Sequence, residues 1–304
     1  MKTSRWLAAA GLILSACASV PPEPVGGKRP AYLDAVTEAV PNRAALTSRA
    51  WTPALDEGYV PQGLTATGQH LFVSSYHPEP DLKSSTGPCR VFRIEMASGR
   101  IDGWFDLPQG RCTHSGGLEY VGNGRLLLAD THRLFLIDLG PALETHKAES
   151  SMKSFSLAGA LRGSFATFDG HDIWIGTWTR DVTRARMFRL DPRLFDEHDG
   201  GTVSDDLASE SIAIPAECQG AAVDRDGDFW LSASNGRWGK LYRVARHGEV
   251  KAQYEMVAGL EDLALDGSGR LWGLSESGTR KYMNWPTRFP FIFRIEVERL
   301  RQRG

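Results

Sequence analysis

The sequence is poor in cysteine, has almost no net charge and contains no long apolar run. It has four cysteines, and its 35 Lys and Arg against 37 Asp and Glu give a formal net charge of −2. Such a balance provides no basic surface for nucleic acid, so we expect no nucleic-acid partner. No apolar stretch approaches the roughly 18 residues needed to cross a bilayer as a helix. A Gly-x-Ser-x-Gly nucleophile motif is also missing, which argues against an elbow-type serine hydrolase.

The N-terminus has the pattern of an export signal. Lys2 and Arg5 precede a short apolar run over 6–14, which ends in Leu-Ser-Ala-Cys at Cys17. This ending resembles a bacterial lipobox, in which the cysteine thiol is diacylated, for example with palmitate. Ala18 follows, where an Asp would favour inner-membrane retention in enterobacterial-type lipoproteins. We therefore expect a lipid-anchored protein of the cell envelope, on the outer membrane and facing the periplasm; the alternative is a soluble secreted protein with an incidental cysteine.

Three cysteines remain in the mature chain, which would meet an oxidising compartment where cysteines form disulfides. Cys89 and Cys112 are close in sequence and lie before consecutive predicted strands, so they are the favoured pair. The alternatives are a Cys112–Cys218 bridge and no bridge at all. Residues 18–45 are rich in Pro and Gly and predict a tether between the lipid and a folded body over 46–304.

The folded body consists of repeated units. An apolar–aromatic–variable–apolar strand recurs with its aromatic residue at positions 92, 135, 188, 242 and 293, in steps of 43, 53, 54 and 51 residues. Two further short strands precede each copy, separated by Gly-containing hairpin turns. Units of this length predict an all-β, five-bladed β-propeller of four-stranded antiparallel blades, with six blades as the alternative. The fifth unit lacks a fourth strand, so we expect the segment 46–51 to supply it and close the ring.

The first strand of each blade should line the central channel, where side chains from all blades converge. Polar residues occur at or just before these strands, and further polar and aromatic residues follow the second strands. We predict a ligand-binding set on this face: Gln62, Tyr76, His114, Ser164, Trp178, Gln219, Asn235 and Glu261. Amides, hydroxyls and stacking rings suit a small-molecule or glycan ligand. The same residues would also suit a water-filled channel.

Two of these residues are candidates for chemistry. His114 is the only His at a blade entrance and could act as a general base. Glu261 and Asp262 are adjacent in a predicted strand, so only one should face the channel, and we assign Glu261 to it. Glu261, Asp130 and Asn235 could hold Ca²⁺ through oxygen ligands.

The segments Asp224-Arg225-Asp226-Gly227-Asp228-Phe229-Trp230 and Asp266-Gly267-Ser268-Gly269-Arg270-Leu271-Trp272 resemble blades of the gluconolactonase, senescence marker protein and strictosidine synthase-like propellers. The resemblance implies a propeller over about 59–298. For the lactonases of that superfamily it also implies a channel Ca²⁺ held by Glu, Asn and Asp. This chain has Gln62 where the first-blade Glu is expected, and five repeats instead of six. Both departures weaken the implied lactonase activity.

Three functions follow as alternatives. The favoured one is an envelope-anchored module that binds a small-molecule or glycan ligand on its propeller face without assigned chemistry, as a monomer attached to the membrane by its lipid. The second is a calcium-dependent hydrolase or lactonase at the channel mouth, with His114 as acid/base and Glu261 among the metal ligands. The third is a protein-docking scaffold, which would need an apolar patch on the disc.

Overall fold

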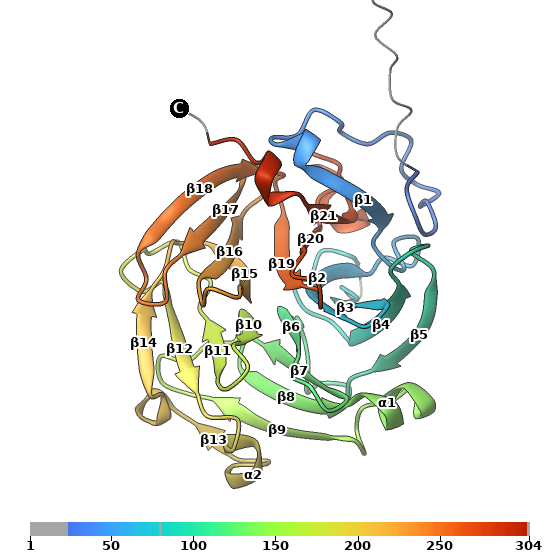
Figure 1. The fold of residues 1–304 in the computed structure, drawn as a ribbon. Coiled ribbons are helices and arrows are strands. Elements are labelled where there is room, and N and C mark those ends of the chain that lie inside the picture. The colour runs from blue at the N-terminus through green and yellow to red at the C-terminus, as the bar shows by residue number, and fades with distance from the viewer. Residues whose placement is uncertain (1–23, 79–80, 303–304) are drawn as a thin grey trace, which may run out of the picture.

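The strands form five sheets around one axis in the computed structural model, which describes residues 24–78 and 81–302 (Figure 1). Blade 1 consists of β2 (Val60–Thr67), β3 (His70–Tyr76), β4 (Cys89–Glu95) and β5 (Ile101–Asp106). Blade 2 consists of β6 (Gly117–Tyr120), β7 (Arg125–Asp130), β8 (Arg133–Asp138) and β9 (Met152–Leu157). Blade 3 consists of β10 (Phe165–Phe168), β11 (Ile173–Gly176), β12 (Arg186–Leu190) and β14 (Glu210–Ala213).

Blade 4 consists of β15 (Cys218–Val223), β16 (Phe229–Ser234), β17 (Gly239–Val244) and β18 (Val250–Met256). Blade 5 consists of β19 (Leu260–Leu265), β20 (Leu271–Ser275), β21 (Phe291–Ile295) and β1 (Leu46–Trp51). The predicted five-bladed β-propeller is therefore confirmed. Two short helices, α1 (Leu139–Thr145) and α2 (Leu194–Glu197), and the two-residue strand β13 (Thr202–Val203) lie in the links after the third strands of blades 2 and 3.

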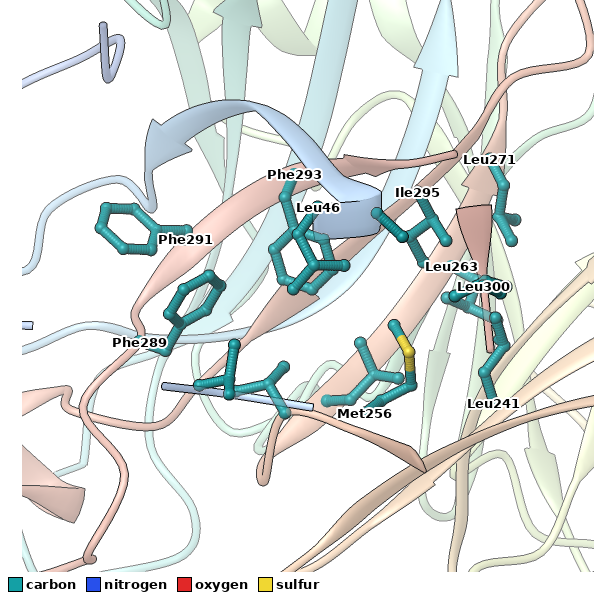
Figure 2. Close-up of a cluster of buried hydrophobic side chains, with 14 of the residues drawn as sticks. Leu46, Leu241, Met256, Leu263, Leu271, Phe289, Phe291, Phe293, Ile295 and Leu300 are labelled. Carbon is teal, nitrogen blue, oxygen red and sulfur yellow. The ribbon is translucent and has the colours of Figure 1, made fainter. Parts of the chain in front are cut away.

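The ring is closed by β1, as the missing fourth strand of the last unit predicts. β1 pairs antiparallel with β21, from Leu46 opposite Ile295 to Trp51 opposite Phe291. Leu46 joins Phe289, Phe293 and side chains of blade 4 in one buried cluster around this seam (Figure 2). Removing this apolar surface from water stabilises the closure, and the pairing leaves β21 without an exposed edge.

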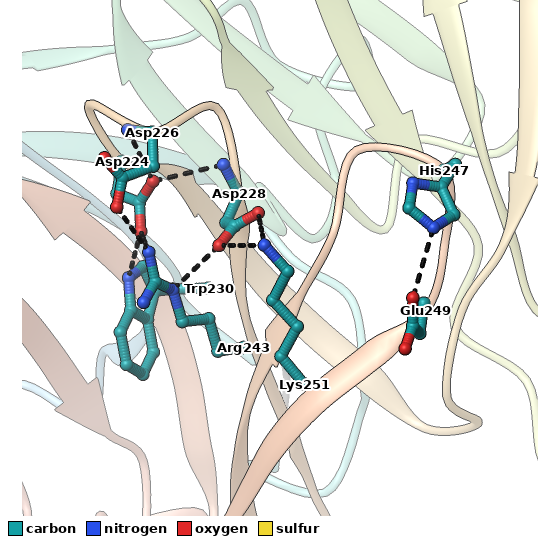
Figure 3. A network of polar contacts seen from close by, with 8 residues as sticks. All are labelled: Asp224, Asp226, Asp228, Trp230, Arg243, His247, Glu249 and Lys251. Atoms are coloured by element: carbon teal, nitrogen blue, oxygen red, sulfur yellow. Dashed lines mark hydrogen bonds and ion pairs between the residues drawn. The ribbon is translucent and has the colours of Figure 1, made fainter.

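The Asp-to-Trp segments form turns that tie the first two strands of a blade together. Asp224 accepts backbone hydrogen bonds from Asp226 and Asp228, and its Oδ2 accepts the indole N–H of Trp230 at 3.2 Å (Figure 3). Arg243 on the third strand forms ion pairs with the carboxylates of all three aspartates. The equivalent bonds from Trp174 to Asp169 and from Trp272 to Asp266 show that the motif is a repeated structural turn.

The N-terminal segment lies against the propeller within the described part of the chain. Leu33 and Val40 are buried in the cluster at the seam, and Gly26 donates a backbone hydrogen bond to Arg49 in β1. The expected tether over 18–45 therefore does not extend through residues 26–45, because two apolar side chains in this Pro/Gly-rich stretch are removed from water. Cys17 and the predicted signal lie outside the described residues. Among the helices that are described, none is long and apolar enough to cross a membrane.

Cys89 and Cys112 form a disulfide with a Cα–Cα distance of 5.8 Å. Cys89 begins β4 in blade 1, and Cys112 lies in the loop that enters blade 2. The bond therefore ties the third strand of one blade to the entrance of the next. Cys218 is buried and free, and burial raises the pKa of its thiol, which keeps it protonated.

Candidate functional site

The first strands of the five blades, β2, β6, β10, β15 and β19, pack against one another in a ring around the axis (Figure 1). Their approach is so close that glycine is needed at several positions. A Cβ added to Gly63 would lie 2.8 Å from the backbone nitrogen of Leu118, and one added to Gly117 would lie 2.4 Å from the nitrogen of Ala166. Both distances are shorter than real Cβ contacts allow, so these glycines permit the inner strands to meet.

Asp262 is buried among the inner strands of this ring. Its Oδ2 accepts backbone N–H groups from Leu64 and Leu118, each at 3.0 Å, and its Oδ1 accepts those of Leu263 at 2.9 Å and Ala221 at 3.3 Å. One carboxylate on blade 5 thereby joins the inner strands of blades 1, 2 and 4. Burial raises the pKa of Asp262, and the backbone donors partly offset that effect.

Glu261 and Asp262 both point inward, so the expectation that only one of them faces the channel is wrong. The register of β19 against β20 shifts between Leu260 and Leu263, which marks a bulge. A bulge interrupts the two-residue alternation of side chains and lets consecutive residues lie on the same side. Both acids are buried, Glu261 at 2% and Asp262 at 0% exposed. The matching first strands β2 and β15 also shift register next to Gln62 and Gln219.

A cavity of about 540 Å³ opens on one face of the ring, among loops from all five blades. It brings together six of the eight predicted ligand-binding residues: Gln62, His114, Ser164, Trp178, Gln219 and Asn235. Its aromatic walls are Trp178, Tyr282 and Trp285, the last two with ring centroids 4.1 Å apart. Ser164 Oγ accepts the backbone N–H of Trp178 at 2.9 Å and so holds that loop in place.

Glu261 and Tyr76, the other two predicted residues, lie behind the lining. Gln219 Nε2 donates to Glu261 Oε1 at 3.0 Å, which connects Glu261 to the cavity through one side chain. The ring of Tyr76 stacks on His114, with centroids 4.9 Å apart, and its hydroxyl accepts from Lys281 Nζ at 2.7 Å. Tyr76 therefore supports His114 from behind and is 0% exposed.

Glu276 is the main residue that the sequence interpretation did not include in the site. It follows β20, lines the cavity and is 5% exposed. Its Oε2 accepts from Gln62 Nε2 at 2.9 Å, and its carboxyl also shares a hydrogen bond with that of Glu261. One signal was available, because Glu276 is a carboxylate directly after the second strand of its blade, β20.

The two carboxyls of Glu261 and Glu276 form a buried pair. Burial raises the pKa of Glu276 to about 7, while Gln62 and Lys281 oppose the shift. Burial and the neighbouring Glu276 raise the pKa of Glu261 well above its usual range. Because two carboxylates in contact repel each other when both are charged, the pair retains one proton near neutral pH.

His114 is held as a neutral side chain. Its Nδ1 lies 2.7 Å from the carbonyl oxygen of Ser85, so Nδ1 carries the proton and Nε2 is the acceptor. Burial lowers the pKa of His114, and the Ser85 bond and Asp130 act in the opposite direction. In this neutral state, Nε2 of His114 can accept a hydrogen bond from a ligand.

The candidate calcium ligands Asp130 and Asn235 both make contacts within the protein. Asp130 Oδ1 accepts the backbone N–H groups of His114 at 2.7 Å and Ser115 at 3.1 Å, so its carboxylate organises the loop entering blade 2. Asn235 lines the cavity and turns its amide toward Glu217. Over the described ranges, no group of three His, Cys, Asp or Glu side chains is arranged to hold a metal ion.

No protein-family model and no curated protein matches this sequence. Solved structures resemble it at low identity. A protein of unknown function from Bacteroides caccae is 7% identical, with a TM-score of 0.40 over 63% of each chain. A luciferin-regenerating enzyme is 9% identical, with a TM-score of 0.44 over 81% of this chain and 94% of the other. The PQQ-bound aldose sugar dehydrogenase of Streptomyces coelicolor is 16% identical, with a TM-score of 0.42 over 72% and 78%. No property of the cavity follows from likenesses at this level.

Proposed function

We propose that this protein is a binding protein of the cell envelope whose propeller cavity takes a small polar ligand, either a small molecule or a fragment of a glycan. The observation that carries the proposal is an unsatisfied group in the cavity wall. Ser234 lines the cavity at 1% exposure, and its Oγ has no hydrogen-bond partner. A buried polar atom without a partner costs free energy, which a ligand that bonds to it would recover.

The rest of the lining suits the same class of ligand. Gln62, Gln219 and Asn235 offer amides from three different blades, while Trp178 and Trp285 offer apolar faces. A ring of a sugar or a similar compound presents hydroxyls at its edge and C–H groups on its faces, so it can use both kinds of contact. The volume of about 540 Å³ lies within the range of cavities that bind small molecules.

A thermal-melting screen of the full-length chain against sugars, glycan fragments and lactones tests the proposal, because a ligand that binds only the folded state raises the melting temperature. A binder should also change the fluorescence of the cavity tryptophans. Gln219→Leu should abolish the shift, whereas Gln253→Leu, on the outer strand β18, should retain it. A ligand that stabilises the wild type and Gln219→Leu equally would place binding outside the cavity.

Two further parts of the proposal concern the anchor and the chemistry. Acylation at Cys17 would attach a monomer to the outer membrane on its periplasmic side; labelling with radioactive palmitate, lost in Cys17→Ala, tests this. The alternative function, a calcium-dependent lactonase, predicts a higher melting temperature with Ca²⁺ and hydrolysis of a lactone. A melting temperature unchanged by Ca²⁺ and unhydrolysed lactones would argue against it.

A further inference from the structure

We infer that the ligand of this cavity carries an ammonium group, which binds at the Glu261–Glu276 carboxyl pair. The inference rests on the proposed function and names the chemical class of its ligand. Glu276 lines the cavity and Glu261 lies directly behind it, so the pair forms an acidic end wall in a space otherwise lined by amides, hydroxyls and rings.

Charge balance around the pair is the first argument. Lys281 is a cation whose charge acts on Glu276, and it donates hydrogen bonds to the Tyr76 hydroxyl and the carbonyl of Ser84. With one shared proton, the pair carries a single negative charge, which Lys281 balances. If an ammonium enters and the shared proton leaves, the second carboxylate balances the ligand. An uncharged ligand cannot balance the charge of the second carboxylate. An anionic ligand would be repelled by the carboxylates and would have no cation to pair with them.

The other titratable groups that face the pair do not change this balance. The hydroxyls of Tyr76 and Tyr282 remain protonated because burial raises the pKa of each above its usual value. His114 is neutral, since burial lowers its pKa. Asp262 is adjacent to Glu261 and is held by backbone N–H donors, and its charge raises the pKa of Glu261, which favours retention of the shared proton. Arg180 lines the cavity, but its guanidinium lies 3.3 Å from the Glu217 carboxylate and is already paired.

The aromatic walls are the second argument. Trp285 and Tyr282 stand in the same cavity as Glu276. Trp285 packs so closely on Gly236 that a Cβ there would lie 2.7 Å from its indole ring. Rigidly held aromatic rings beside a carboxylate are a favourable surrounding for an ammonium, which is attracted to ring faces and to the negative charge. Ser234 Oγ supplies a further oxygen that has no partner within the protein.

The test compares compounds that differ only in an ammonium group. Benzylamine and benzyl alcohol form one pair, and glucosamine and glucose form another. Isothermal titration with the full-length chain should give an affinity for each amine at least tenfold above that for its neutral counterpart, as expected for a hydrogen bond to a charged group. Benzylamine should also bind more tightly as the pH rises from 6 to 8, because the shared proton must leave. Repeating the titration in buffers of different ionisation enthalpy gives the number of protons released on binding.

Two variants locate the effect. Glu276→Gln should reduce the preference for the amine over its neutral counterpart to about twofold or less and remove the proton release. Glu249→Gln is the matched control, because Glu249 is exposed on the hairpin beside His247 (Figure 3) and is not a lining residue of the cavity. It should retain the full preference. The proton count uses the wild-type chain, so the inference stays testable even if Glu276→Gln does not fold.

The outcomes separate the inference from the proposed function. If neutral compounds bind in the cavity as tightly as the amines, or if amine binding releases no proton, the ammonium assignment is wrong and the binding function remains. If amines and neutral compounds, including the sugars and glycan fragments of the melting screen, all fail to bind, both are wrong. Preference for the amine that persists in Glu276→Gln would place the cation elsewhere and overturn the assignment.

Discussion

Replacing Asp262 by asparagine should strongly destabilise the propeller, although the two side chains have nearly the same shape. The carboxylate accepts four backbone N–H groups, two at each oxygen, from strands of four different blades. Asparagine retains only one oxygen, so two of the donors would face an NH₂ group that cannot accept them.

The magnitude follows from the cost of an unsatisfied buried donor. Each orphaned N–H costs about 1–3 kcal/mol, so two of them cost about 2–6 kcal/mol. The whole folding free energy of a typical protein is about 5–15 kcal/mol. Asp262→Asn should therefore lose a large share of the total stability, and Asp262→Ala, which satisfies none of the donors, should lose more.

Urea unfolding followed by tryptophan fluorescence and by far-UV circular dichroism measures this loss, provided that the two transitions coincide. Glu119→Gln is the control. Glu119 is a second carboxyl on an inner strand. Its Oε1 accepts the backbone N–H of Tyr120, which an amide oxygen can also accept, and its other partners include the hydroxyls of Thr65 and Thr167, which can rotate to suit an amide. We expect a loss of about 1 kcal/mol or less there. An Asp262→Asn loss no greater than that of Glu119→Gln would refute the role assigned to the axial carboxylate.

Three further predictions concern stability. Burial raises the pKa of Glu119 from 4.5 to about 7, so the folded state holds a proton that the unfolded chain has lost; stability from this group should be complete below about pH 4.5 and fall by up to about 3 kcal/mol through pH 7. Urea titrations from pH 5 to 8 should show the decline, and Glu119→Gln should make it shallower, since the other buried carboxyls still contribute; a decline of the same steepness in Glu119→Gln would contradict the role given to Glu119. Reduction of the Cys89–Cys112 bond, which spans 23 residues, should cost about 3 kcal/mol, measured in urea with and without dithiothreitol. Trp51→Ala, at a buried position of the closing strand, should cost about 3–5 kcal/mol, whereas Trp178→Ala, 38% exposed, should cost far less by the same assay.

Much of the fold follows from local patterns in the sequence. The aromatic third strands and the Gly-containing hairpin turns recur once per blade, and each depends on residues that are neighbours in the chain. The absence of a fourth strand in the last unit predicted that the segment 46–51 closes the ring, and β1 occupies that place. Counting repeats was therefore sufficient for the number of blades.

The candidate site was predicted only in part. Six of the eight predicted residues line one cavity, because equivalent positions in each blade meet at the same face. Glu276 was not selected, because the sequence around β20 does not indicate that its side chain meets those of Gln62 and Glu261, which come from other strands. The packing of residues 26–45 was also missed, because it depends on the fit of Leu33 and Val40 to a distant surface.

The sequence by itself thus determined the repeat, the blade count and the face on which polar groups gather. Tertiary structure alone decided that Glu261 and Asp262 both point inward, because the bulge in β19 depends on how that strand pairs with β20. It also decided the meeting of two carboxyls and the position of Asp262 among backbone donors of three other blades. These features arise where strands far apart in the sequence converge on one axis, and no local pattern records that convergence.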